Sequence, residues 1–296
     1  MLSPRPVYEV YALRYGSHAA RQANENFLSD PHDDSPMPLD FYIWAIRSGH
    51  RTIVVDTGFD ADTATKRARR LTQTPASLLR TIGINAADVD DVVLTHMHYD
   101  HAGNLSEFPR AVFHIQDAEM AYCTGRFMCH GHLRKPFEAA DVVNAVRHLY
   151  EGRLRFHNGT GEIAPGVTVH LIGGHTAGLQ VVRVATARGW VVLASDAAHY
   201  WANIRNRSPF PIVLDVGHMM DGYRKIEELA DGPDHVIPGH DPGVLEQFPA
   251  WPGEPNIVAV HEPPIVAPSL ANPIVERRRP GTAVPSPDCL KESSGP

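Results

Sequence analysis

The sequence predicts a mixed, layered α/β fold, because strand-like runs come first in a hairpin and later alternate with helix-like stretches. Short runs rich in β-branched and aromatic residues are typical of strands. These runs are residues 41–46, 52–55, 92–94, 167–172, 181–184, 190–193 and 235–237. The first two are separated only by a short polar segment with a glycine, which predicts the hairpin.

Helix-like stretches lie between or after these runs, at residues 75–82, 117–122, 138–150 and 221–229. The third of them has the clearest period, because its apolar residues Val142, Val143, Val146 and Leu149 recur at helical spacing. One face of this helix is therefore expected to pack on a sheet.

Composition excludes several classes of protein. The 296 residues carry 27 basic and 34 acidic side chains, and the net charge of −7 gives no general attraction to nucleic acid or anionic lipid. The most apolar stretch, residues 181–198, is interrupted by Arg183 and Arg188, so no membrane or export segment is expected. Three cysteines fit a reducing compartment better than a disulfide framework. We expect a cytoplasmic protein that binds neither nucleic acid nor membrane.

Potential metal ligands crowd one short segment of this chain, which has 18 histidines. His96, His98, Asp100 and His101 lie within six positions, directly after an apolar run. On an extended backbone His96 and His98 project to the same side, whereas Asp100 and His101 lie beyond the turn and can face a neighbouring point. One motif can therefore serve two metal ions.

Three later strand-like runs each lead to a further potential ligand, and these ligands are His175, Asp196 and His240. Glycines beside the two histidines suit tight turns. The ligands are therefore expected to gather along one edge of a sheet. Seven side chains suffice for two sites of three or four ligands each, with an open position for water.

This pattern resembles the metallo-β-lactamase fold superfamily. The resemblance rests on the HxHxDH motif at residues 96–101, on the three later ligands in the same order, and on Asp56 in an early Asp-Thr-Gly element. It covers about residues 7–255. It implies an αββα sandwich, with two mixed sheets flanked by helices, and a metal-dependent hydrolase with a dinuclear site.

The resemblance also implies a role for each ligand. The first zinc ion is bound by His96, His98 and His175, the second by Asp100, His101 and His240, and Asp196 bridges the two. Asp56 is expected to orient a ligand histidine. We therefore expect two Zn²⁺ per chain, with iron, cobalt or manganese as alternatives for such mixed nitrogen and oxygen sites.

Within the superfamily, the sequence is most similar to N-acyl-homoserine lactonases and pyridoxolactonases, through GHTAGLQ at residues 174–180 and SDAAHY at 195–200. Class B β-lactamases usually have cysteine in place of Asp196, and the diiron branch has an acidic residue in place of His98. Lactonases of this group usually have a tyrosine three positions after the bridging aspartate. This chain has His199 there, followed by Tyr200, to which we assign the hydroxyl role, with His199 as the alternative.

The implied function is hydrolysis of a lactone, with an N-acyl-homoserine lactone as substrate and quorum quenching as the outcome. Hydroxide formed between the metals attacks the carbonyl. Tyr200 or His199 donates a hydrogen bond to the oxyanion, and Asp100 delivers a proton to the leaving alkoxide.

Candidates for the wall of an acyl pocket are aromatic or methionine side chains, namely Phe127, Met128, Trp201 and Phe210. Packing within an ordinary loop is an equal alternative for the segment around Met128.

Residues 1–261 are expected to form the hydrolase domain, and residues 262–296 a Pro-rich, disordered tail. The polar insertion at residues 18–34 suggests a dimer arm.

Other functions stay open. A thioesterase of the glyoxalase II type uses the same ligands, although no basic cluster for glutathione is obvious in the sequence. Hydrolysis of another lactone and a non-catalytic metal-binding role are further alternatives. Nucleic-acid processing is disfavoured by the net charge.

Overall fold

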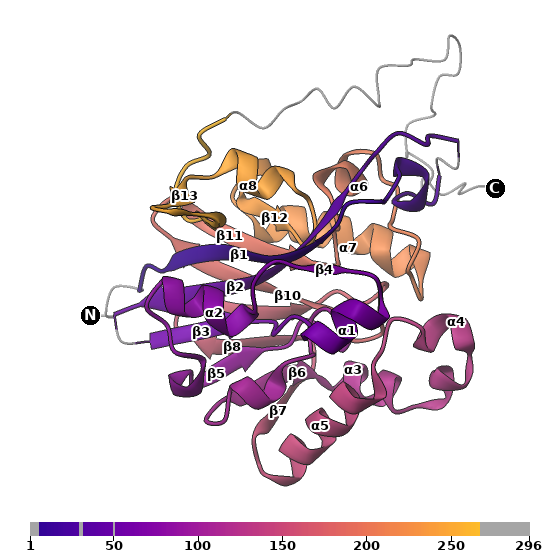
Figure 1. The fold of residues 1–296 in the computed structure, drawn as a ribbon, viewed down its shortest axis with the longest axis horizontal. Coiled ribbons are helices and arrows are strands. Elements are labelled where there is room, and N and C mark those ends of the chain that lie inside the picture. The colour runs from indigo at the N-terminus through magenta and orange to yellow at the C-terminus, as the bar shows by residue number, and fades with distance from the viewer. Residues whose placement is uncertain (1–5, 30–31, 50, 267–296) are drawn as a thin grey trace, which may run out of the picture.

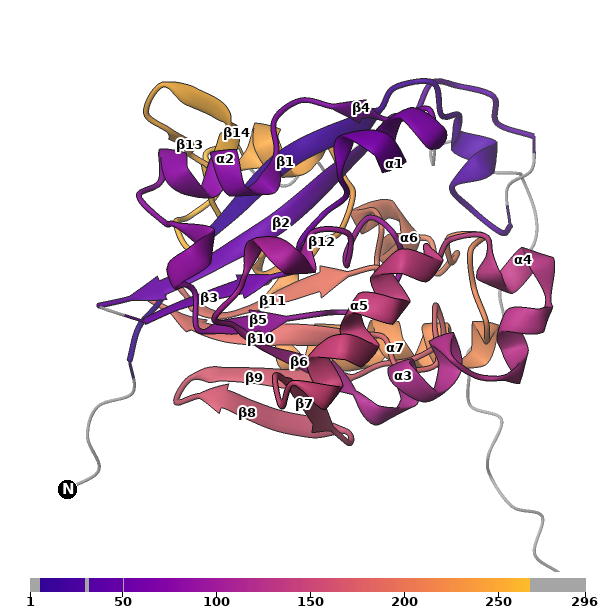
Figure 2. The ribbon, with the colours of Figure 1, turned by 60° about the horizontal axis from the view of Figure 1, so that its bottom comes forward.

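The computed structural model describes residues 6–29, 32–49 and 51–266. Two β-sheets pack face to face, and helices cover both outer faces (Figure 1 and Figure 2). The predicted αββα sandwich of two mixed sheets is therefore confirmed. The predicted C-terminal tail lies outside the described residues from position 267 onward. None of the described helices is both long and apolar enough to cross a bilayer.

The first sheet has nine strands. Its order is β13-β14-β1-β2-β3-β5-β6-β7, with β4 paired to β1, and the pairs from β3 to β7 are parallel. The strands are β1 (Glu9–His18), β2 (Leu39–Ser48), β3 (Arg51–Val55), β4 (Arg70–Leu71), β5 (Asp91–Val93), β6 (Val112–Gln116), β7 (Leu154–His157), β13 (Ala250–Trp251) and β14 (Glu254–Ala259). The predicted hairpin is confirmed as β2 and β3, which pair in antiparallel register.

The second sheet has five strands in the order β12-β11-β10-β9-β8. Only the pair β11 and β12 is parallel. The strands are β8 (Thr160–Ala164), β9 (Val167–Leu171), β10 (Gln180–Thr186), β11 (Gly189–Ser195) and β12 (Val236–Pro238).

All four predicted helices are present, and the last begins earlier than expected because Asp215 caps it by accepting from the backbone N–H of His218. The α-helices are α1 (Ala61–Lys66), α2 (Pro75–Thr81), α3 (Asp117–Cys123), α4 (Gly131–Arg134), α5 (Ala139–Tyr150), α6 (Trp201–Arg205), α7 (Val216–Leu229) and α8 (Gly243–Gln247). Short 3₁₀ turns are η1 (Ala23–Glu25), η2 (Ala86–Asp88), η3 (Leu105–Glu107), η4 (Arg126–Cys129) and η5 (Pro233–His235).

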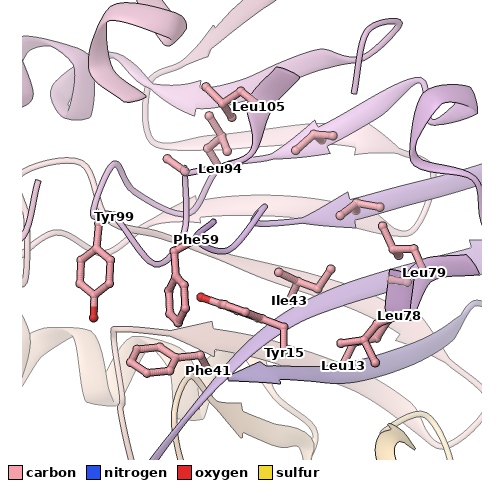
Figure 3. Packing of buried hydrophobic residues seen from close by; sticks show 14 of the residues in the cluster. Leu13, Tyr15, Phe41, Ile43, Phe59, Leu78, Leu79, Leu94, Tyr99 and Leu105 are labelled. Atoms are coloured by element: carbon pink, nitrogen blue, oxygen red, sulfur yellow. The ribbon is translucent and has the colours of Figure 1, made fainter. Parts of the chain in front are cut away.

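The core has three layers, which follow from the alternation of side chains along a strand. Val10 and Ala12 of β1 belong to the cluster between the sheets, whereas Leu13 and Tyr15 belong to the outer cluster, which also holds side chains of α2 and α5. Figure 3 shows this outer cluster, in which Tyr15 and other aromatic rings lie close together beside the leucines. A third cluster joins the second sheet to α6 and α7. Packing between these layers therefore fixes the positions of the strand ends.

Candidate metal centre

The seven predicted ligands come together at one edge of the sandwich. The loop after β5 supplies residues 96–101, and the segments after β9, β11 and β12 supply His175, Asp196 and His240. The structure thus brings residues from both sheets to one place, although only the 96–101 group is local in sequence. All seven side chains are buried.

The first group of ligands is His96, His98, His175 and Asp196, whose ligand atoms all lie within 4.8 Å of one another. His175 Nε2 lies 3.0 Å from His98 Nδ1 and 3.0 Å from Asp196 Oδ2. His96 Nε2 lies 3.5 Å from the same carboxylate oxygen. Three imidazole nitrogens and one oxygen therefore converge on one point, as a tetrahedral zinc site requires.

The second group is Asp100, His101 and His240, and it faces the other oxygen of Asp196. Asp196 Oδ1 lies 3.2 Å from His101 Nε2 and 2.8 Å from His240 Nε2. Asp100 Oδ2 lies 3.8 Å and 3.9 Å from the same two nitrogens. Asp196 therefore turns one oxygen to each group, which is the arrangement of a bridging ligand.

The residues fit a pair of cations by chemistry as well as by position. The Nε2 atoms of His96 and His101 are buried and have no hydrogen-bond partner among the described residues, an arrangement that is costly unless a ligand satisfies them. Burial and neighbouring histidines lower the pKa of His96 and His98 well below the ordinary value, so their lone pairs are free to bind a metal. Burial opposes ionisation of Asp196, but the surrounding histidines hold its pKa well below its usual range.

Three of the five ligand histidines are oriented by their second ring nitrogen. These contacts are His96 Nδ1 to Thr95 Oγ1 at 3.1 Å, His101 Nδ1 to Asp56 Oδ2 at 2.7 Å, and His240 Nδ1 to the Asp40 carbonyl oxygen at 2.8 Å. The Asp56 carboxylate also accepts from the backbone N–H and the hydroxyl of Thr95, both at 2.8 Å. Such contacts fix the tautomer and the direction of a metal-binding imidazole.

The assignment of the hydroxyl role to Tyr200 requires correction. The Tyr200 hydroxyl donates to the Pro38 carbonyl oxygen at 3.1 Å and lines no part of the cavity described below. His199 lies beside the ligand cluster instead, with Nε2 3.2 Å from Asp196 Oδ2 and its ring stacked on Phe210 at a centroid distance of 3.7 Å. One residue of displacement turns Tyr200 away, because it is the N-cap residue just before α6 and packs in the core.

A cavity of about 230 Å³ opens over the ligand cluster. Of the four predicted pocket residues, only Phe210 lines it. Trp201 lies elsewhere, since its Nε1 donates to the Val236 carbonyl oxygen at 2.7 Å and its ring borders a second cavity. Phe127 and Met128, in η4, are also outside the lining of the first cavity. The prediction that these three residues form its wall is therefore corrected.

Glu119 is a supporting residue that the sequence did not reveal. It is fully buried at the start of α3 and accepts from the backbone N–H of Met97 at 2.9 Å, from Thr176 Oγ1 at 2.6 Å, and from the backbone N–H of Gly178 at 3.0 Å. One carboxylate thus joins the loop of His96 and His98 to the loop of His175. A Cβ on Gly178 would lie 2.1 Å from the Glu119 backbone nitrogen, so the two segments need glycine to approach this closely.

Replacing Glu119 with glutamine should lower stability and loosen the first group of ligands. The amide can accept at one end only, so at least one backbone N–H then meets an NH₂ group, at a cost of about 1–3 kcal/mol. We expect a lower melting temperature and weaker zinc binding, measured by calorimetry and by metal analysis after dialysis. Glu228→Gln, an exposed change on α7, is the control. Equal behaviour of the two variants would contradict the bridging role of Glu119.

Two facing sheets with paired histidine and aspartate sites at one edge define a class of metal-dependent hydrolase. Residues 41–240 match the Metallo-beta-lactamase superfamily, and the chain belongs to this family.

Curated proteins and solved structures give more distant similarities. A probable metallo-hydrolase of Mycobacterium tuberculosis is 26% identical over 199 residues, 64% of this chain, and the match spans only 60% of that relative's length. The N-acyl homoserine lactonase AttM of Azorhizobium caulinodans is 25% identical over 268 residues, with 82% of this chain and 97% of the relative covered.

Among solved structures, a quorum-quenching N-acyl homoserine lactone lactonase has a TM-score of 0.66 at 21% identity, with coverage of 80% and 93%. An N-acyl homoserine lactone hydrolase with N-hexanoyl-L-homoserine at its metal centre has a TM-score of 0.68 at 19% identity, with coverage of 83% and 98%. These two structures establish the likeness of fold.

Proposed function

We propose that this chain is a dinuclear zinc hydrolase that opens lactone rings, with N-acyl-homoserine lactones as the substrate class and quorum quenching as its role. The observation that carries the proposal is the pair of ligand groups bridged by Asp196 at the base of a cavity. The similarity to the N-acyl homoserine lactonase AttM over most of both chains supports the choice of lactone.

When bound, two zinc ions supply a water of lowered pKa and polarise the substrate carbonyl. Proton delivery and contact with the substrate carbonyl fall to side chains of the protein. Asp100 lines the cavity beside both ligand groups, where its carboxylate can carry a proton to the leaving oxygen. His199 also lines the cavity beside Asp196, and we assign to it the place next to the reacting carbonyl.

An activity panel with zinc-loaded protein tests the proposal. Loss of lactone and release of protons are expected with N-acyl-homoserine lactones, and both should stop after chelation and return after zinc is restored. Simple γ-lactones and S-lactoylglutathione are the comparison substrates, because another lactonase or a glyoxalase II-like thioesterase would use the same ligands. Intact acyl-homoserine lactones in the presence of fully loaded protein would overturn the assignment.

A further inference from the structure

One wall of the cavity over the metal centre is cationic. His18, Arg21, Arg69 and Lys135 all line the cavity that also reaches Asp196. They come from the end of β1, the segments beside η1 and β4, and the end of α4. In Figure 2 the segment between β1 and β2 extends to the same end of the molecule as α4 and α6. Sequence reasoning missed this group because its members are far apart along the chain.

Neither Arg21 nor Arg69 forms an ion pair with a carboxylate among the described residues, and of the carboxylates only Glu25 acts on Arg21 at longer range. Arg21 Nε donates to Asn26 Oδ1 at 2.7 Å, and its NH2 group donates to the Glu25 carbonyl oxygen at 2.5 Å. Arg69 Nε donates to the Tyr99 hydroxyl at 3.2 Å. All three acceptors are neutral groups. Partly buried cations without a direct ion pair are costly, so such a pair points to an anion that arrives with a ligand.

Arg67 shows the contrast within the same cavity. Its guanidinium forms an ion pair with Glu138 at 2.8 Å and lies over the Tyr99 ring at 3.9 Å. Arg67 therefore has an ion-pair partner within the fold, whereas Arg21 and Arg69 have none among the described residues. Burial, with Arg69 and Arg21 as further causes, lowers the pKa of His18 to about 4. His18 is therefore neutral at pH 7, and Arg21, Arg69 and Lys135 carry the positive charge of this wall.

The cationic wall lies close to the reacting centre. The Arg21 guanidinium lies 4.8 Å from the centre of the Phe210 ring, and that ring stacks on His199, which contacts Asp196. A substrate of modest length can therefore place its carbonyl at the ligand cluster and a second group at the arginines.

We propose that the substrate carries a carboxylate, which Arg21 and Arg69 bind while its lactone lies at the metal centre. The inference rests on the proposed function and deepens it, since it names the chemistry of the acyl group. A guanidinium fork matches a carboxylate in both geometry and charge. A plain alkyl chain would leave both arginines without a counter-ion.

N-glutaryl-homoserine lactone and its methyl ester test this proposal, because they differ in one negative charge. With zinc-loaded protein, the acid should have a KM at least tenfold below that of the ester. Arg69→Met should remove this preference, and Arg69→Lys should restore part of it. Arg110→Met is the matched control, since Arg110 pairs with Asp90 at 2.9 Å on the surface and lines no part of the cavity. Equal KM values for acid and ester in the unchanged protein would overturn the inference.

A binding measurement separates this inference from the proposed function. Titration calorimetry with the ring-opened N-glutaryl-homoserine and N-hexanoyl-homoserine needs no turnover. The glutaryl compound should bind at least tenfold more tightly, and Arg69→Met should abolish the difference. If no lactone is hydrolysed but this difference is found, the proposed function fails and the carboxylate site stands. If both lactones are hydrolysed and the difference is absent, the carboxylate site fails and the proposed function stands.

Discussion

Replacing Asp196 with asparagine should lower kcat/KM by more than about a hundredfold, because even residues that only orient a ligand cost 10–100-fold. Asp196 Oδ2 faces His96, His175 and His199, and Oδ1 faces His101 and His240. An amide keeps one oxygen and turns an NH₂ group toward the other set of nitrogens. It also removes the negative charge that offsets two divalent cations. One of the two sites should therefore lose its metal.

Metal analysis and steady-state kinetics on the same preparation check this result. Zinc content should fall from about two equivalents to one or fewer after equal loading. Asp221→Asn makes the same chemical change on the exposed face of α7, where Asp221 pairs with Arg224, and should leave both quantities as they were. If the Asp196 variant keeps its full zinc content and its activity, the Asp196 carboxylate does not bridge two metal ions.

Replacing Asp56 with asparagine should damage both stability and the second group of ligands. Asp56 is completely buried and accepts three hydrogen bonds, two from Thr95 and one from His101 Nδ1. Its backbone has φ 63°, a left-handed conformation that asparagine adopts readily, so the substitution changes the hydrogen bonds without straining the chain. An unsatisfied donor in this place costs about 1–3 kcal/mol.

Chemical denaturation of the metal-free protein measures that loss, and competition with a chelator measures metal binding. We expect a lower unfolding free energy and about 10–100-fold weaker binding of one of the two metals. Asp62→Asn, an exposed change in the first turn of α1, controls for the chemistry of the substitution. If the Asp56 variant binds both metals as tightly as the unchanged protein, His101 does not depend on Asp56 for its orientation.

The metal ligands could be predicted from the sequence because their signals are local. Four ligands share one motif after a strand, and each of the other three follows a strand-like run. β11 and β12 are parallel neighbours, so the residues that follow them, Asp196 and His240, lie at the same end of the second sheet. The predicted strands were recognisable for a similar reason, because each is a short run rich in β-branched and aromatic residues, and the helix at 138–150 by its helical period.

Features that depend on contacts between distant segments could not be predicted. β1 was missed because its ten residues include a single β-branched one, Val10, so it lacks the composition by which the other strands were recognised. Glu119 shows no motif, and its role follows only from the approach of two loops. Tyr200 was misplaced because a shift of one residue at the start of α6 decides which side chain faces the cavity. Arg21 and Arg69 meet only in the folded chain.

The composition of the two ligand groups has a mechanical consequence. The first group takes His96 and His98 from the loop after β5 in one sheet and His175 from the segment after β9 in the other. The second takes Asp100 and His101 from the first sheet and His240 from the second. Any ion in either group is therefore bonded to both halves of the sandwich. A cation held by either group would therefore add a bonded link between the two sheets at this edge, next to the apolar core that already joins them.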